Sequence, residues 1–143
     1  MIGLLQRVSR AYVSVDGLTI GEIGRGLLVL VAVHRDDTDR DIARLGERIL
    51  SYRVFPDDEG RMYRSLKDLD GGLLLVPQFT LAADTKKGTR ASFTKAAAPE
   101  KGAAYFAQLA DICRDALGHV ETGEFGANMQ VNLVNDGPVT FWL

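Results

Sequence analysis

Two short stretches of this sequence hold residue types that packing alone does not explain, and the first is PQFTL at residues 77–81. It places an amide, an aromatic ring and a hydroxyl, those of Gln78, Phe79 and Thr80, at the end of a buried apolar run. Thr80 could act as a nucleophile only with a base beside it, and the sequence offers no obvious base. Backbone N–H groups at this strand end could instead stabilise a developing oxyanion. A strand that simply turns into its loop is the other interpretation.

The second stretch is NDGPVT at residues 135–140, in which Gly137 is followed at once by Pro138. Asp-Gly before an apolar run is typical of a hairpin turn, so the end of the chain predicts a short final hairpin. If the Gly137–Pro138 bond is cis, the flanking carbonyls can point the same way and accept hydrogen bonds from one ammonium group. Gly137 would also let another molecule approach the backbone closely. A tight trans turn without such a role is the alternative.

The other reactive side chains fit structural roles. His34 ends a buried run, His119 follows a helix stop, and Cys113 lies on an apolar helix stripe, where a thiol behaves as a small hydrophobe. The carboxylates at residues 57–59 fall in a predicted turn and are expected to be solvated. The sequence has no nucleophile elbow, P-loop, dinucleotide-binding fingerprint or zinc-ligand spacing. We therefore expect neither a metal nor a cofactor.

The charges of the chain are unevenly distributed. A net charge of −2 argues against general binding of nucleic acid through charge. Residues 85–95, however, carry Lys86, Lys87, Arg90 and Lys95 with no acid among them. This run indicates either a solvated loop or a local surface that contacts phosphates.

The chain has the sequence features of a cytoplasmic protein. A single cysteine excludes an internal disulfide framework and fits a reducing compartment. No apolar run approaches the ~20 residues that cross a bilayer. The first ten residues lack the apolar length and cleavage site of a signal peptide. We expect a cytoplasmic location and no membrane partner.

Apolar patterning predicts the strands and helices that would position these residues. Alternation predicts strands at 3–15 and 18–24, and continuous apolar runs predict buried strands at 26–34 and 71–81. One predicted helix starts at Asp37 or Thr38 and ends near Tyr52; another has Pro99 in its first turn and stops at Gly118. A turn is predicted at 56–61, and residues 119–143 are predicted to form two or three strands.

This order of elements predicts one mixed α/β (α+β) domain over residues 1–143. Its sheet is expected to be largely antiparallel or mixed and to form a barrel-like core with two covering helices. A doubly wound fold is less favoured, because the predicted strands at both ends come in hairpins.

Four motifs together resemble one known family. They are QRVSRAYVSVDG near the start, PQFTLAADTKKGTRASF in the middle, and FGANMQV and NDGPVT near the end. In this order and spacing they are similar to motifs of the D-aminoacyl-tRNA deacylases, formerly called D-tyrosyl-tRNA deacylases, from Arg7 to the end of the chain. The resemblance implies a metal-independent homodimeric hydrolase that cleaves the ester between a D-amino acid and the 3′-terminal adenosine of tRNA. Such an enzyme proofreads translation by chirality, rejects L-aminoacyl-tRNA and accepts glycyl-tRNA.

The resemblance implies a role for the Gly-Pro motif. In the family this bond is cis and reaches into the pocket of the partner subunit. Here it corresponds to Gly137–Pro138, whose carbonyls would hold the α-amino group and whose crowding would exclude an L side chain. Arg7 resembles the residue that fixes the orientation of this motif.

The QFTL stretch matches the other half of the family's pocket, with Gln78, Phe79 and Thr80 at the reaction centre. Either the Thr80 hydroxyl or the terminal 2′-hydroxyl of the tRNA would assist attack on the ester, and the sequence leaves both open. Phe125 and Met129 resemble residues that line the pocket for the terminal adenosine. The residues implied to contact tRNA phosphates are Lys86, Lys87 and Arg90.

The chain departs from the family's pattern at three positions. Pro77 stands where Ser is usual, Ala82 where an aromatic residue is common, and Ala91 where Pro is common. Pro77 removes a hydroxyl and an N–H at the pocket's edge, so we expect altered affinity or polarity but retained activity. Two alternatives remain: a tRNA-binding dimer that has lost hydrolysis, and a module that binds free D-amino acids. No DNA partner is expected.

Overall fold

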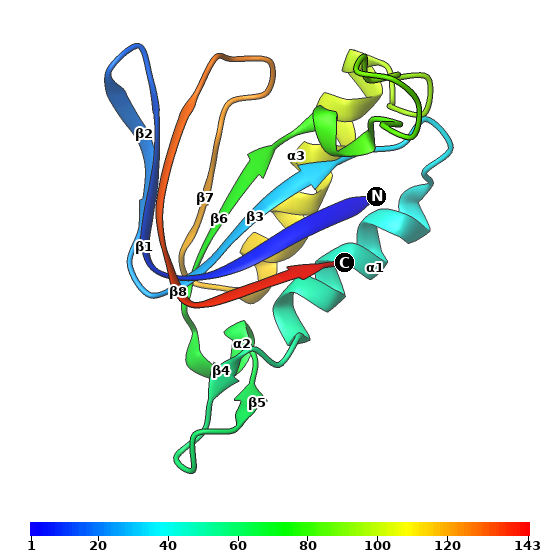
Figure 1. The fold of residues 1–143 in the computed structure, drawn as a ribbon. Coiled ribbons are helices and arrows are strands. Elements are labelled where there is room, and N and C mark those ends of the chain that lie inside the picture. The colour runs from blue at the N-terminus through cyan, green and yellow to red at the C-terminus, as the bar shows by residue number, and fades with distance from the viewer.

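A six-stranded sheet forms the body of the protein in the computed structural model, which describes residues 1–143. Strand β1 (Ile2–Val15) pairs antiparallel with β2 (Leu18–Ile23) and β3 (Gly26–Ala32) on one side. On its other side β1 pairs antiparallel with β8 (Gln130–Trp142), the last strand of the chain. The two ends of the chain therefore lie side by side in the sheet (Figure 1).

The sheet is mixed and curls into a nearly closed barrel. Strands β6 (Gly72–Pro77) and β7 (Val120–Thr122) extend it beyond β3, and both of these pairings are parallel. The curl brings β2 back against β7, so a Cβ added to Gly21 would lie 3.2 Å from the carbonyl oxygen of Thr122. The predicted mixed α+β fold with a barrel-like core is confirmed (Figure 1).

Strands β3 and β6 are buried on both faces. Leu27 and Leu73 belong to the large apolar cluster beneath the helices, whereas Leu28 and Leu74 belong to a smaller cluster inside the curled sheet. Burial of each such side chain contributes about 2 kcal/mol to stability. Two-sided burial explains why both strands are continuous apolar runs in the sequence.

Two helices, α1 (Asp39–Ser51) and α3 (Pro99–Ala116), cover one face of the sheet (Figure 1). The Asp41 carboxylate accepts a 2.8 Å hydrogen bond from the N–H of Thr38, the residue at the N-cap of α1. Pro99 occupies the first turn of α3, where its missing N–H costs nothing. Both predicted helices are confirmed. No helix of the protein has both the length and the apolar character that crossing a membrane requires.

The predicted strand over 71–81 is wrong in its second half. The strand ends at Pro77, and the 3-10 turn η1 (Phe79–Ala82) follows. The N–H of Gln78 donates to the carbonyl of Val31 at 2.7 Å, after which the chain leaves the sheet.

The segment between α1 and β6 contains elements that the sequence does not predict. The predicted turn at residues 56–61 joins two short strands, β4 (Phe55–Pro56) and β5 (Met62–Arg64), and the short helix α2 (Leu66–Leu69) follows. The β4–β5 hairpin projects from the end of the sheet at the bottom of Figure 1.

The predicted final hairpin is also wrong. Strand β8 runs past Gly137–Pro138 and pairs with β1 on both sides of it, so residues 136–139 bulge out opposite one residue of β1. We call residues 136–139 the β8 bulge. The Gly137–Pro138 peptide inside it is cis, which excludes the trans turn. The pairs that flank the bulge are Val8 with Asn135 and Gln6 with Thr140.

Candidate active site

A pocket of about 290 Å³ lies where β6 ends, and four predicted site residues line it. Gln78 and Phe79 come from the segment after β6, and Phe125 and Met129 from the segment between β7 and β8. The rest of the lining of this β6 pocket is Val76, Pro77, Gly126, Ala127 and Val131. The parallel β6–β7 pairing brings these two stretches together, because it places the ends of both strands at the same edge of the sheet.

Thr80 lies beside the β6 pocket and does not line it. Its Oγ1 accepts a hydrogen bond from the Nε2 of Gln78. An amide nitrogen of this kind cannot take a proton from the hydroxyl. The side-chain partner of Thr80 therefore orients the hydroxyl without activating it as a nucleophile.

Two aromatic rings line the pocket, those of Phe79 and Phe125, and the ring of Phe93 packs against Phe79. Phe79 is 57% exposed and Phe93 is 43% exposed, and their ring centroids are 5.2 Å apart. Phe125 packs against α3 at Gly102, where an added Cβ would lie 3.0 Å from the Phe125 Cζ. Exposed aromatic faces of this kind can stack on a nucleic-acid base. Phe93 is a candidate site residue that the sequence analysis missed, although an aromatic ring within a run of cations was visible.

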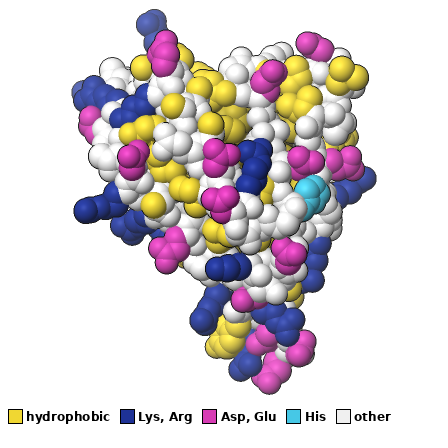
Figure 2. Space-filling view, turned by 180° about the vertical axis from the view of Figure 1, so that it is seen from behind, with side chains coloured by type: hydrophobic (Ala, Val, Ile, Leu, Met, Phe, Trp, Pro, Cys, Tyr) yellow, Lys and Arg dark blue, Asp and Glu magenta, His cyan; other side chains and the backbone are white.

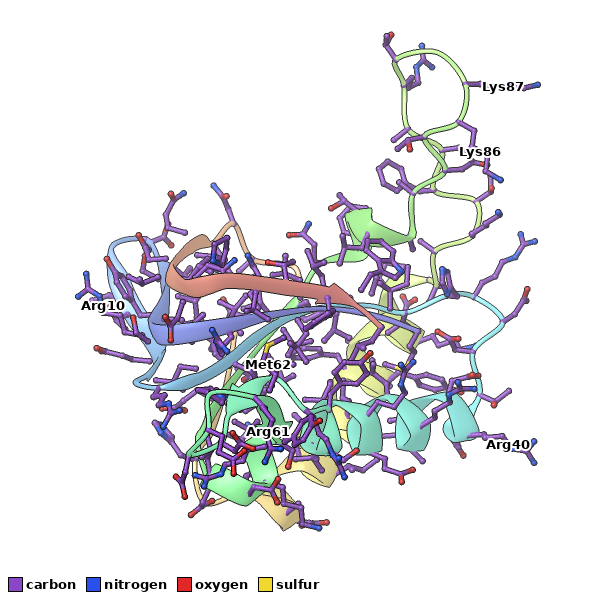
Figure 3. All side chains as sticks on the ribbon, turned by 60° about the horizontal axis from the view of Figure 1, so that its bottom comes forward. Arg10, Arg40, Arg61, Met62, Lys86 and Lys87 are labelled. Atoms are coloured by element: carbon purple, nitrogen blue, oxygen red, sulfur yellow. The ribbon has the colours of Figure 1, made fainter.

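The loop that follows η1 carries the predicted cationic residues. Backbone hydrogen bonds of 2.8 and 3.0 Å between Asp84 and Ser92 close its base. Lys86 and Lys87 project from it away from the body of the protein (Figure 3). Lys86, Lys87 and Arg90 are exposed and form no ion pair with an acid.

The cations of the β4–β5 hairpin are arranged differently. Arg61 pairs with Asp57 at 3.0 Å, and Arg64 pairs with Asp58 at 3.0 Å. Figure 2 shows the resulting mixture of acidic and basic side chains at this end of the molecule, at the bottom of the view. The loop beside the β6 pocket therefore carries uncompensated positive charge, whereas the charges of the hairpin compensate one another.

Arg7 holds the β8 bulge in place. Its Nε donates to the carbonyl of Asp136 at 2.9 Å, and its Nη1 donates to the carbonyl of Val54 at 2.7 Å. The side chain is 13% exposed, so its charge is largely removed from water. The two hydrogen bonds therefore stabilise the buried guanidinium group. The structure thus places Arg7 against the Gly137–Pro138 segment.

Only glycine fits at position 137. Its φ is +139°, a conformation that L residues rarely adopt. An added Cβ would lie 2.8 Å from Val139 Cγ2 and 3.2 Å from Arg7 Nη2. Asp136, Gly137 and Pro138 are all exposed, so a second molecule can approach the backbone here.

The β6 pocket and the β8 bulge lie at opposite ends of the sheet. The register places Asn135 beside Val8, Val8 beside Gly26 and Gly26 beside Gly72, where β6 begins. The pocket lies beyond the other end of β6, roughly 16 Å further along the strand direction. Figure 1 shows the bulge toward the β4–β5 hairpin and η1 at the far end. The predicted site residues therefore form two separate groups within one chain.

The remaining reactive groups lie outside both groups of site residues. Cys113 is buried, and desolvation raises the pKa of its thiol to about 12, so it stays protonated and unreactive at neutral pH. The backbone N–H of His34 donates a 2.6 Å hydrogen bond to Oδ2 of Asp37. The Nε2 of His119 lies 3.5 Å from Oε1 of Glu121. No three His, Cys, Asp or Glu side chains converge in a way that could hold a metal ion.

Comparison with known proteins identifies the family. The model of the family described as D-Tyr-tRNA(Tyr) deacylase matches residues 4–143. A protein of Alkalilimnicola ehrlichii named D-aminoacyl-tRNA deacylase is 62% identical over 143 residues, which are 100% of this chain and 95% of that protein.

Two solved structures are also similar. One, described as c-Myc DNA Unwinding Element Binding Protein, matches with a TM-score of 0.95 at 36% identity, over 100% of this chain and 97% of that one. Another, described as a probable eukaryotic D-amino acid tRNA deacylase, has the same fold, with a TM-score of 0.89 at 21% identity over 99% and 97% of the two chains. Because the family model covers almost the whole sequence, this chain belongs to the D-aminoacyl-tRNA deacylase family.

Proposed function

We propose that this protein hydrolyses the ester bond between a D-amino acid and the 3′-terminal adenosine of tRNA. Water adds to the ester carbonyl, the bond to the ribose oxygen breaks, and that oxygen leaves with a proton. The products are the free D-amino acid and tRNA. The observation that carries the proposal is the exposed Gly137–Pro138 backbone, held by Arg7, in a chain that also has an aromatic-lined pocket at Gln78 and Phe79.

The β6 pocket is the proposed site for the terminal adenosine. Its volume of about 290 Å³ suits one nucleoside. Phe79 and Phe125 offer aromatic faces for the base, and Met129 offers a polarisable side chain that adapts its shape. The reacting ester would then lie near η1, whose first N–H groups have no partner within the turn and could receive the developing oxyanion.

The β8 bulge is the proposed chiral filter. The carbonyls of Gly137 and Pro138 would accept hydrogen bonds from the substrate's α-ammonium group. With that group and the ester fixed, an L side chain would point into the bulge backbone, whereas a D side chain would point away from it. Glycine has no side chain to reject, so glycyl-tRNA should also be hydrolysed.

The filter and the pocket would meet in a homodimer. Within one chain they lie at opposite ends of the sheet, so the bulge of one copy would have to enter the pocket of the other. A twofold arrangement completes two such sites at once. The exposure of both groups of residues supports this assembly.

The attacking water is proposed to be activated by the substrate rather than by a side chain of the protein. Thr80 has only the Gln78 amide beside its hydroxyl, which supports assistance by the terminal 2′-hydroxyl of the tRNA. Gln78 and Thr80 would position the ester, and no metal or cofactor is needed for this step.

The cationic loop is proposed to contact the tRNA backbone through Lys86, Lys87 and Arg90. Contacts to phosphates fix the position of a nucleic acid without reading its sequence. One of the similar solved structures is described as c-Myc DNA Unwinding Element Binding Protein, and this description names DNA as the ligand of that protein. We propose no DNA partner here, because the net charge of the chain is −2. The proposed location is the cytoplasm, where aminoacylated tRNA is used.

Deacylation of matched D-tyrosyl-, L-tyrosyl- and glycyl-tRNA by the purified protein, with and without a chelator, tests this proposal. We expect rapid, chelator-insensitive loss of the D-tyrosyl and glycyl esters and survival of the L-tyrosyl ester. Binding of tRNA without any hydrolysis would favour the inactive tRNA-binding dimer instead, and Pro77→Ser would then be the first reversion to test. Binding of free D-tyrosine without affinity for tRNA would favour a small-molecule module.

A further inference from the structure

The side chain of Asn135 spans the β8 bulge. Its Oδ1 accepts a hydrogen bond from the N–H of Val139 at 3.1 Å, and its Nδ2 donates to the Oγ1 of Thr140 at 2.9 Å. Asn135 is the last paired residue before the bulge, and Thr140 is the first paired residue after it. One half-buried amide therefore connects the two ends of the bulge directly.

The bulge needs such a connection because the strand ladder is interrupted there. Residues 136–139 pair with no residue of β1, and three of the four are exposed. Two side chains supply hydrogen bonds in place of the ladder. Arg7 binds the carbonyl of Asp136, and Asn135 binds the N–H of Val139.

These two side chains act on different properties of the bulge. Arg7 belongs to β1 and also binds the carbonyl of Val54, so it fixes where the bulge lies relative to the sheet. Asn135 belongs to β8 itself and fixes the distance between the entry and the exit of the bulge. That distance determines how the backbone of Gly137 and Pro138 is presented to solvent.

We propose that Asn135 and Thr140 are positioning residues for chiral discrimination, and this inference rests on the proposed function. Their hydrogen bond, with the bond from Asn135 to Val139, keeps the bulge narrow. A bulge that opens would misplace the two carbonyls that hold the ammonium group and would make room for an L side chain. Misplacement of about 1 Å can cost a reaction about 100-fold, so small changes in this spacing are sufficient.

The test compares variants that remove these hydrogen bonds with minimal change of shape. Asn135→Leu removes both bonds, Thr140→Val removes one, and Thr140→Ser keeps the hydroxyl. Asn132→Leu is the matched control, because Asn132 is a half-buried residue of the same strand whose amide contacts only Gln130, at 3.5 Å. For each variant, kcat and KM are measured on D-tyrosyl- and L-tyrosyl-tRNA, together with the melting temperature.

We expect Thr140→Val to lower the ratio of D to L hydrolysis about fivefold and Asn135→Leu to lower it about tenfold. Thr140→Ser keeps the hydroxyl and should show the wild-type ratio. Asn132→Leu should also leave the ratio unchanged. A purely structural role would lower the melting temperature and both rates together, without changing their ratio. If Asn135→Leu does not fold, the pair Thr140→Val and Thr140→Ser decides the question.

Unchanged discrimination in Asn135→Leu and Thr140→Val, with the wild type active, would overturn this inference and leave the proposed function standing. Absence of D-tyrosyl-tRNA hydrolysis by the wild-type protein in the same assay would overturn the proposed function itself.

Discussion

The Nε of Arg7 lies 2.9 Å from the carbonyl oxygen of Asp136 and donates a hydrogen bond to it. This bond joins the first strand of the chain to the residue that precedes Gly137 in the last strand. The Asp136 carboxylate lies 3.9 Å from the same nitrogen but is exposed, so the carbonyl contact contributes more than the ion pair. The position of the β8 bulge therefore depends on a residue far away in the sequence.

Arg7→Lys should weaken both the fold and the filter. A single ammonium group cannot reach the carbonyls of Asp136 and Val54 with the geometry of the guanidinium fork. Loss of one bond should lower the free energy of unfolding by about 1–2 kcal/mol, measured by urea denaturation. The ratio of D- to L-tyrosyl-tRNA hydrolysis should fall in parallel. Arg10→Lys, at an exposed position of the same strand, is the control and should change neither quantity. Wild-type stability in Arg7→Lys would contradict the role given to Arg7.

Gly137→Ala should abolish hydrolysis of the D-ester while leaving the protein folded. The new methyl group would lie 2.8 Å from Val139 Cγ2 and close to Arg7, so the bulge must change shape. A loss of about 100-fold or more in kcat/KM is expected. Gly60→Ala is a matched control, because Gly60 also has a positive φ, +79°, with no atom within 4 Å of the added Cβ. Normal turnover in Gly137→Ala would refute the filter.

Thr80→Ala tests the source of the nucleophile. Because Thr80 lacks a neighbouring base, its removal should lower kcat by about tenfold at most, the effect of deleting one positioning hydrogen bond. A tRNA ending in 2′-deoxyadenosine should be a much poorer substrate for the wild-type enzyme. Single-turnover rates on both tRNAs provide the measurement. A loss of activity of about 10⁴-fold in Thr80→Ala would instead identify its hydroxyl as the nucleophile.

The double variant Lys86→Ala, Lys87→Ala should weaken binding of tRNA in a salt-dependent way. These lysines carry unpaired charge on an exposed loop, so removing each phosphate contact should reduce the slope of log kcat/KM against log salt by about 0.7. The value of kcat at saturating tRNA should not change. Lys67→Ala, on α2 at the other end of the molecule, is the control. An unchanged salt slope in the double variant would show that the loop does not contact tRNA.

The sequence predicts most of the fold because its main features are local. The helix start at Thr38 and Asp41 and the Pro99 turn are short-range patterns, and the two-sided burial of β3 and β6 appears as continuous apolar runs. The end of β6 is misjudged because Phe79 and Leu81 extend the apolar pattern by alternation, although the chain turns after Pro77.

The candidate site is less predictable because it depends on long-range pairing. Asp136–Gly137 has the local form of a hairpin turn, but β1 pairs with both halves of β8 and turns the segment into a bulge. The contact of Phe93 with Phe79 and the bridge from Asn135 to Thr140 likewise appear only when the chain is folded. The residue types were visible in the sequence, but their partners were not.

Subunit complementation tests the central claim most directly. One chain carries Gly137→Ala in the bulge, the other carries Gln78→Ala with Phe79→Ala in the pocket, and each should be inactive alone. In a mixed dimer the intact bulge of one chain can enter the intact pocket of the other, so mixing the two chains should restore about a quarter of wild-type D-tyrosyl-tRNA hydrolysis. Mixed dimers that form but remain inactive would contradict a site shared between two copies of the chain.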